Sequence, residues 1–195
     1  MHQKTSDIRQ TVNTLLNRDN RKYDLQLRQL KDTEKMDRFK VYGELLTAYG
    51  YSAESGISTF ETTDFYTGKQ ISIPLDASIS AVENGKNYFK KYSKLKRTRD
   101  ALNDIIKETR DEIEHLESIL ISIDMAQTPE DIADIRHELS DSGYIKKQNT
   151  GNKKGRSART GKSEPLHYIS SDGFHMYVGK NNYQNEYISF KIASG

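Results

Sequence analysis

An apolar seam that runs from Tyr88 to Ile123 constrains the fold more than any other feature of the sequence. Its members are spaced alternately by four and three residues, which is the heptad pattern of a coiled coil, and only two of them are polar. They are Tyr88, Tyr92, Leu95, Arg99, Leu102, Ile106, Thr109, Ile113, Leu116, Leu120 and Ile123. A capping-box pattern at Ser80 precedes the seam, and a new helix start at Thr128 follows it. The sequence therefore predicts one long helix over roughly residues 80–125.

A second helical pattern, over residues 4–49, supplies the partner that this seam needs. Its apolar residues form a broad stripe without an interrupting proline, although the phase of the stripe slips between Leu30 and Phe39. Basic residues gather early in this segment and acidic residues gather late in the long helix, which favours antiparallel packing. Between the two helices, "STFETTDFYTGKQISIPL" alternates around a Thr-Gly pair and predicts a small β-hairpin near residues 57–75. This hairpin would form the tip of the helix pair.

The segments after the long helix change in character twice. A short third helix is predicted from Pro129 to about Ser140, and the basic stretch after it has too few apolar residues to pack. We therefore expect a mainly α chain with a C-terminal partial antiparallel β-sheet. Residues 1–145 would form a long antiparallel coiled-coil hairpin, 146–165 a basic flexible linker, and 166–195 the beginning of a truncated β-domain.

The C-terminal sheet is expected to begin with a hairpin. The Asp-Gly pair at residues 172–173 is typical of a two-residue type I′ turn, which would place His167 opposite Val178. In that register His167 and His175 point to opposite faces and cannot share a metal. A third run, over residues 187–192, alternates again and predicts a third strand. Three strands bury too little apolar area to be stable alone, so we expect the chain to stop inside a domain.

Composition excludes several classes of site. The chain has no cysteine, which excludes disulfides, thiol catalysis and Cys-ligated zinc. It has no apolar run of membrane-spanning length and no hydrophobic signal core, so neither membrane insertion nor export is expected. No phosphate-binding loop, GxSxG nucleophile or zinc-ligand spacing appears, and the histidines are scattered. We expect a non-enzymatic protein without a cofactor or a metal.

The strongest candidate for binding is the run "KNYFKKYSKLKRTR" at the start of the long helix, which contains no acidic residue. The formal net charge of the chain is only +2, so affinity for nucleic acid has to come from such local clusters. The candidate RNA-binding residues in it are Lys86, Lys90, Lys91, Lys94, Lys96 and Arg97. The alternative is a solvated face that pairs in part with Asp37 and Glu44. The aromatic residues within the run have seam spacing, which favours core packing over base stacking.

The predicted linker is a second candidate, because flexible basic segments bind phosphate backbones without reading sequence. Its candidate residues are Lys146, Lys147, Lys153, Lys154, Arg156 and Arg159. Flexible basic linkers also occur without any partner, and the sequence alone leaves both interpretations open.

Five segments together resemble one family. They are "YGELLTAY", "ISIPLDASISAVENGKNYFKKYSKLKR", "EIEHLESIL", "EDIADIRHELSDSGYI" and "SDGFHMYVGKNNYQNEYISFKIA". They occur in the order seen in the NFACT family, in its bacterial RqcH type, which was long labelled fibronectin-binding protein A. The resemblance covers most of residues 5–193, and its last part is similar to the start of the family's RNA-binding NFACT-R domain. The chain thus resembles the family's middle coiled-coil arm followed by the first NFACT-R strands.

The resemblance implies a part in ribosome-associated quality control. Such proteins bind large ribosomal subunits (50S) obstructed by peptidyl-tRNA, recruit alanine-charged tRNA and promote template-free alanine tails on the nascent chain. This chain would act as the ribosome-binding arm in the cytoplasm, and tRNA would be bound mainly by domains that are absent from it. The matching "GKNN" turn carries over Lys180, Asn181 and Asn182 as RNA-facing residues. Their alternative role is turn formation, since Gly and Asn favour tight turns.

Two other interpretations stay open. The family's older label predicts a surface adhesin that binds fibronectin or fibrinogen, on the bacterial cell surface, although the sequence shows no export signal or anchor. A generic coiled-coil scaffold is the other, and only the resemblance argues against it. The exposed edges of an unfinished sheet would also allow a homodimer.

Overall fold

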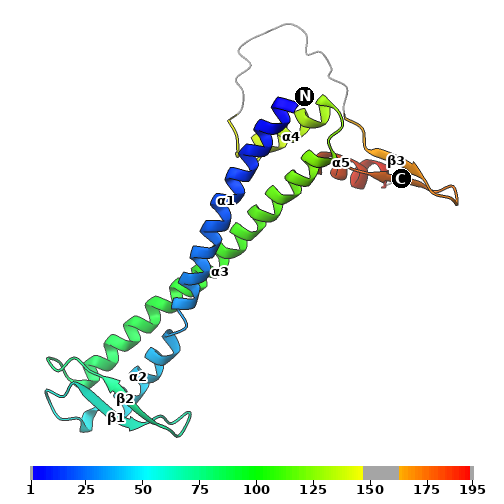
Figure 1. The fold of residues 1–195 in the computed structure, drawn as a ribbon. Helices are drawn as coiled ribbons and strands as arrows, with labels where there is room; N and C mark the ends of the chain where they lie inside the picture. Colours follow the sequence, from blue (N-terminus) through cyan, green and yellow to red (C-terminus); the bar gives the residue numbers. More distant parts are fainter. Residues whose placement is uncertain (1, 147–162, 194–195) are drawn as a thin grey trace. The chain divides into compact units, whose positions relative to one another are not determined.

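The structure of the chain, a computed structural model, describes residues 2–146 and 163–193. Its elements are α1 (His2–Asp32), α2 (Met36–Tyr49), a 3-10 turn (Gly50–Ser52), β1 (Thr59–Thr63), β2 (Gln70–Pro74), α3 (Ala81–Met125), α4 (Pro129–Asp141), β3 (Leu166–Ile169), β4 (His175–Val178), α5 (Asn182–Tyr187) and a π-helical turn (Ile188–Ile192) (Figure 1). The chain is mainly α with two small antiparallel sheets, as the sequence predicts.

The chain forms two compact units. Unit 1 contains Met1–Asn20 and Asp111–Gly195, and unit 2 contains Arg21–Arg110. Both α1 and α3 therefore contribute to each unit. Within the part of the chain that the structure describes, none of the helices combines the length and the apolar character that crossing a membrane requires.

In unit 1, the first part of α1, the last part of α3 and the whole of α4 share one apolar core (Figure 1). Its buried residues are Ile8, Val12, Leu16, Leu116, Ile119, Ile123, Ile132, Ile135 and Leu139. Ile119 lies outside the predicted heptad seam, and it is buried because α4 adds a third helix to the core. An ion pair between Arg9 and Asp124 joins α1 to α3, in agreement with the charge pattern that predicted antiparallel packing.

In unit 2, α2, the first part of α3 and the hairpin β1-β2 surround a smaller core (Figure 1). Its buried residues are Tyr42, Leu45, Leu46, Ile73, Ala81 and Tyr88. Two glycines allow α2 and α3 to approach closely. A Cβ on Gly43 would lie 3.0 Å from the Phe89 ring, and a Cβ on Gly85 would lie 3.1 Å from the Leu46 Cβ. A side chain at either position would therefore require its neighbour to shift by a few tenths of an ångström.

The predicted single helix over residues 4–49 is interrupted in the structure. α1 ends at Asp32 and α2 begins at Met36, so the prediction of one continuous helix is wrong. The intervening turn is tightened by hydrogen bonds from the Thr33 amide to the Leu30 carbonyl and from the Met36 amide to the Thr33 carbonyl, both 2.9 Å. The Thr33 hydroxyl, which is buried, also donates to the Leu30 carbonyl at 2.6 Å. The phase slip in the apolar stripe marked this break, because a stripe that changes phase cannot face one core along a straight helix.

The hairpin between the long helices forms as predicted. β1 pairs with β2 from Thr59 opposite Pro74 to Thr63 opposite Gln70. The loop between them is closed by Asp64, whose carboxylate accepts hydrogen bonds from the Tyr66 amide at 2.9 Å and the Thr67 hydroxyl at 2.8 Å.

The C-terminal hairpin has a different register from the predicted one. His167 lies opposite Tyr177 and Ile169 opposite His175, one residue away from the expected pairing. The Ser170 amide donates a hydrogen bond to the Phe174 carbonyl at 2.9 Å, so the loop between the strands contains three residues rather than two. Gly173, the last of the three, has a positive φ of 83°, as is typical of a three-residue hairpin loop that ends in a bulge. A one-residue shift moves one strand's side chains to the other face. His167 and His175 therefore share a face, with His167 Nε2 2.8 Å from His175 Nδ1.

The predicted third strand over residues 187–192 is also wrong, because the chain is helical there. The Asn181 side chain accepts a hydrogen bond from the Gln184 amide at 2.9 Å and caps α5, which continues into the π-helical turn at Ile188–Ile192. An alternation over six residues is too short to decide between strand and helix, and the cap decides it here.

We expect Leu116→Ala to lower the free energy of unfolding by about 2–5 kcal/mol, because it leaves a cavity in the core of unit 1 where Leu116 is fully buried. Ile121→Ala is the matched control on the same helix, since Ile121 is 61% exposed, and its effect should stay within about 0.5 kcal/mol. Urea unfolding followed by circular dichroism measures both. Equal losses for the two variants would contradict the core described here.

Candidate nucleic-acid interface

Six cations that the sequence singled out lie exposed on the first half of α3, within unit 2. They are Lys86, Lys90, Lys91, Lys94, Lys96 and Arg97, and together they are named the cationic face. Lys86, Lys90, Lys94 and Arg97 follow one another at helical spacings of four, four and three, so they form one stripe along α3. The buried seam residue Tyr88 lies on the other side of the helix. Burial of the seam therefore turns the stripe toward solvent.

No described carboxylate forms an ion pair with the cationic face. Glu44, one of the two acids that could have neutralised it, binds Lys40 at 3.8 Å and accepts a hydrogen bond from the Tyr66 hydroxyl at 3.0 Å. No ion pair joins Asp37, the other acid, to any of the six cations within the described residues. The charges of the face remain available to an external polyanion.

Among the aromatic residues within the same run, Tyr88 serves the core, as expected. Tyr88 is buried, and its ring contacts those of Tyr42 and Phe39 at centroid distances of 5.2 and 5.7 Å. Its hydroxyl donates to the Pro74 carbonyl at 2.6 Å. The Lys91 ammonium lies 5.0 Å from the centre of the Tyr88 ring, which places that cation by a cation–π contact.

The second predicted group of cations is only partly covered by the structure. Lys146 is exposed just after α4. The other predicted linker cations, Lys147, Lys153, Lys154, Arg156 and Arg159, lie outside the described residues.

The three residues of the "GKNN" turn lie in unit 1, and two of them are not on its surface. Lys180 is 6% exposed, and its ammonium lies 2.7 Å from the Asp131 carboxylate, which is 1% exposed. Asn181 is buried as the N-cap of α5, and only Asn182 is exposed. The expectation that Lys180 and Asn181 face RNA is therefore corrected, because their polar groups are used to attach the C-terminal segment to α4.

Asp131 is the centre of this attachment. It is the third residue of α4, and one of its oxygens accepts hydrogen bonds from the Gln127 and Thr128 amides, both at 2.9 Å. Its other oxygen binds Lys180 and accepts a hydrogen bond from Ser163. Burial by itself would raise the pKa of Asp131, but the hydrogen bonds from Lys180, Ser163 and the two amides outweigh it and hold that pKa well below its ordinary value of 3.8. The carboxylate is thus ionised at neutral pH.

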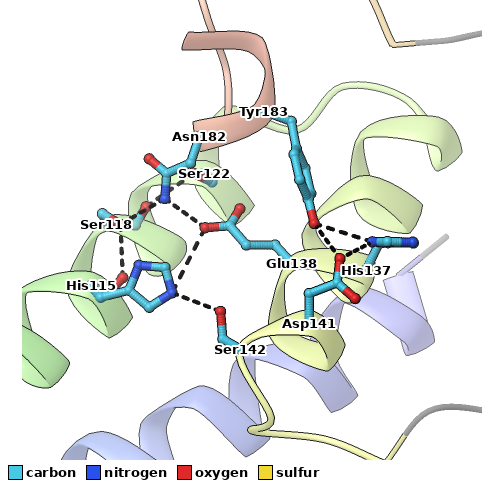
Figure 2. A network of polar contacts seen from close by, with 9 residues as sticks. All are labelled: His115, Ser118, Ser122, His137, Glu138, Asp141, Ser142, Asn182 and Tyr183. Atoms are coloured by element: carbon cyan, nitrogen blue, oxygen red, sulfur yellow. Dashed lines mark hydrogen bonds and ion pairs between the residues drawn. The ribbon is translucent and has the colours of Figure 1, made fainter. Parts of the chain in front are cut away.

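A second polar network joins α3, α4 and α5 in unit 1 (Figure 2). Asn182 donates to the buried Glu138 carboxylate at 2.5 Å, and the Tyr183 hydroxyl donates to Asp141 at 2.9 Å. His137 Nδ1 lies 2.8 Å from the same Asp141 carboxylate. Burial, followed by the hydrogen bond to Asp141, raises the pKa of Tyr183 to about 12. These contacts fix α5 on the surface of α4.

His115 and His137 take part in this network, whereas His167 and His175 contact each other on the hairpin β3-β4. His115 Nε2 shares a hydrogen bond of 3.3 Å with the Ser142 hydroxyl and lies 3.9 Å from Glu138 (Figure 2). Within the described ranges, no group of three or more His, Asp or Glu residues is placed to hold a metal ion. The helix start at Thr128 was visible in the sequence, but nothing in the sequence signalled that Asp131 in its first turn pairs with the distant Lys180.

Comparisons with known proteins agree with this architecture. A sequence profile of the NFACT N-terminal and middle domains matches residues 1–158. The Rqc2 homolog RqcH of Streptococcus suis (strain 05ZYH33) is 34% identical over 192 residues, which is 98% of this chain and 34% of the relative. The Rqc2 homolog RqcH of Bacillus subtilis (strain 168) is 34% identical over 170 residues, which is 85% of this chain and 29% of that protein. The chain spans about a third of the length of these relatives.

A solved structure is also similar. It is the C-terminal part of the fibronectin/fibrinogen-binding protein from Streptococcus suis, with a TM-score of 0.67 and 28% sequence identity. The match covers 98% of this chain and 61% of that one, so the fold described here is shared along nearly the whole chain.

The pKa of Asp131 predicts an acid-dependent loss of stability. Because the folded state holds this pKa below the unfolded value of about 4, the contribution of Asp131 is complete at neutral pH and falls as the pH drops from about 5 toward 2. Asp131→Asn lacks this titration, so the difference in unfolding free energy between the native chain and the variant should shrink across that range. Urea unfolding at a series of pH values measures it. A difference that stays constant with pH would contradict the proposed role of the ion pair.

Proposed function

Because the chain belongs to the NFACT family, we propose that it acts as the ribosome-contacting part of a quality-control factor of the RqcH type, with the cationic face of α3 as its RNA-binding surface. In this proposal the chain is a non-enzymatic, cytoplasmic binding module. The longer protein would bind obstructed 50S subunits and tRNA and promote alanine tailing of the stalled nascent chain. The other domains of such a protein would supply most of the contacts to tRNA.

The observation that carries the proposal is the set of exposed cations on α3 without carboxylate partners among the described residues. Clustered cations near the N-terminus of a helix oppose its macrodipole, so the local structure of α3 gains nothing from them. A ribosomal surface gives them a role, since rRNA phosphates bind Lys and Arg with release of counterions. The exposed face is also held on a rigid element, because α3 packs on α2 and β2 through the core of unit 2.

Co-sedimentation with purified 50S subunits across a salt series tests the proposal. We expect the affinity of the chain for 50S subunits to fall steeply with salt. The logarithm of the association constant should decrease linearly with the logarithm of the salt concentration, with a slope on the order of −0.7 to −0.9 for each phosphate contact. The triple variant Lys86→Glu, Lys90→Glu and Lys94→Glu should bind at least tenfold more weakly, because three attractive charges become repulsive.

The matched control reverses three other exposed cations of unit 2, Arg21→Glu, Arg28→Glu and Lys31→Glu, and changes the net charge by the same amount. This control should retain most of the affinity if the location of the charge decides binding. Equal losses of affinity in both variants would show that net charge alone decides binding. An unchanged affinity of the first variant would show that the cationic face is not part of the interface.

A second candidate function is binding of fibronectin or fibrinogen, favoured by the name of the similar solved structure from Streptococcus suis. We expect the chain to bind immobilised fibronectin only weakly, since a cationic helix face attracts polyanions more strongly than a protein of mixed charge. Surface plasmon resonance at physiological salt, with the Lys86, Lys90 and Lys94 reversal as the control, measures this. Binding at nanomolar concentration that survives the reversal would favour this second function instead.

A further inference from the structure

A cavity lies beside the cationic face in unit 2. It is formed where β2 ends and the first turns of α3 pass over it, and its volume is about 490 Å³. This lies within the usual range for small-ligand sites, roughly 300–1,000 Å³. Lys90 and Lys91 line the cavity and also belong to the cationic face. A polyanion bound along the face would therefore pass the mouth of the cavity.

The walls of the cavity are fixed by hydrogen bonds. The Tyr88 hydroxyl donates to the Pro74 carbonyl at 2.6 Å and ties the end of β2 to α3. The Asn84 amide makes two contacts with Asp76, donating to its carbonyl at 3.0 Å and accepting from its backbone amide at 2.9 Å. Asn84 is 5% exposed, so this clamp is buried. Because the walls are already ordered, a ligand that binds there does not have to offset the entropic cost of ordering them.

The groups that line the cavity differ in chemistry. Pro74, Leu75 and Tyr88 provide apolar surface, and Lys90 and Lys91 provide positive charge. Among the described residues, the only side-chain hydrogen bond of Asn87 is the one of 3.5 Å that its oxygen accepts from Lys90, which leaves its amide nitrogen to a ligand.

An anionic group stands among these residues as well. Hydrogen bonds from the Ser78 hydroxyl and amide lower the pKa of Asp76, so this carboxylate is ionised at neutral pH. A free phosphate would be repelled by Asp76, whereas a ligand that carries both a phosphate and an N–H donor satisfies the lysines and the carboxylate together. A nucleotide with an exocyclic amino group has this combination.

We propose that the cavity holds a single unpaired nucleotide of the RNA that the cationic face contacts. The base would lie against Pro74 and Leu75 with its edge toward Asn87 and Asp76, and the flanking phosphates would lie against Lys90 and Lys91. A paired base cannot enter, because its edge and both faces are already used in the duplex. This inference rests on the proposed function and adds to it that the interface distinguishes unpaired from paired RNA.

The test compares two RNA duplexes that differ only in whether one 2-aminopurine is bulged or paired. The full 195-residue chain is titrated into each, with fluorescence anisotropy for affinity and 2-aminopurine emission for the environment of the base. We expect about tenfold tighter binding of the bulged duplex, because only an unpaired base can enter the cavity and add its contacts there. We also expect a change in 2-aminopurine emission for the bulged duplex only.

Two matched variants locate the effect. Asn87→Ala should weaken binding of the bulged duplex about three- to tenfold and leave the paired duplex unchanged, because one hydrogen bond to the base edge is lost. Asn103→Ala, an exposed asparagine on the same helix outside the cavity, should change neither.

Equal affinity for the two duplexes, or bulge binding without a change in emission, would overturn the inference. So would an Asn87→Ala variant that behaves like Asn103→Ala. A chain that binds 50S subunits but shows no preference for the bulge would retain the proposed function and lose only the cavity's role. A chain that binds no 50S subunits would lose the proposed function itself.

Discussion

Burial of the apolar seam of α3 is the constraint on which the rest of the structure depends. The helix is 45 residues long, and an apolar stripe of that length cannot be left in water. In unit 1 it is covered by α1 and α4, and in unit 2 by α2 and the hairpin β1-β2. Once the seam faces inward, the opposite face of the helix is fixed as solvent-facing. The stripe through Lys86, Lys90 and Lys94 is exposed for this reason, so core packing creates the candidate interface.

A different kind of interaction attaches the C-terminal segment in unit 1. The contact between Lys180 and Asp131 is a buried ion pair, and such pairs contribute less to net stability than their geometry suggests, because both charges lose their hydration. Their common contribution is to allow one arrangement and penalise others. Here the pair, together with the contacts of Asn182 and Tyr183, orients the start of α5 on α4 (Figure 2). The hairpin β3-β4 that precedes it has few buried side chains, so these polar contacts carry the attachment.

Prediction from sequence succeeded where a pattern was long. The seam extends over ten spacings and predicted α3 and its burial, and the charge pattern predicted that the early part of α1 packs against the late part of α3. It failed where a pattern was short, and where the apolar stripe of the first helical segment changed phase between α1 and α2. The alternation over residues 187–192 predicted a strand, but the cap at Asn181 starts a helix there instead. One additional loop residue shifted the register of β3 against β4. The cationic face was identified correctly as an exposed cluster, but the burial of Lys180 could not be predicted, since its partner Asp131 is remote in sequence.

The sequence by itself determined the helical character of the long segments and the location of the cations, because periodicity and charge are local properties that any packing must respect. The tertiary structure alone decided which polar residues are available to a ligand. Lys90 lies in a basic run and Lys180 in the "GKNN" turn, and both were candidates for RNA contact, yet one is exposed and the other is buried against a carboxylate. The cavity beside Tyr88 also depends on a strand end and a helix brought together from different parts of the chain. Such differences arise from contacts between distant residues, and a local pattern holds no information about them.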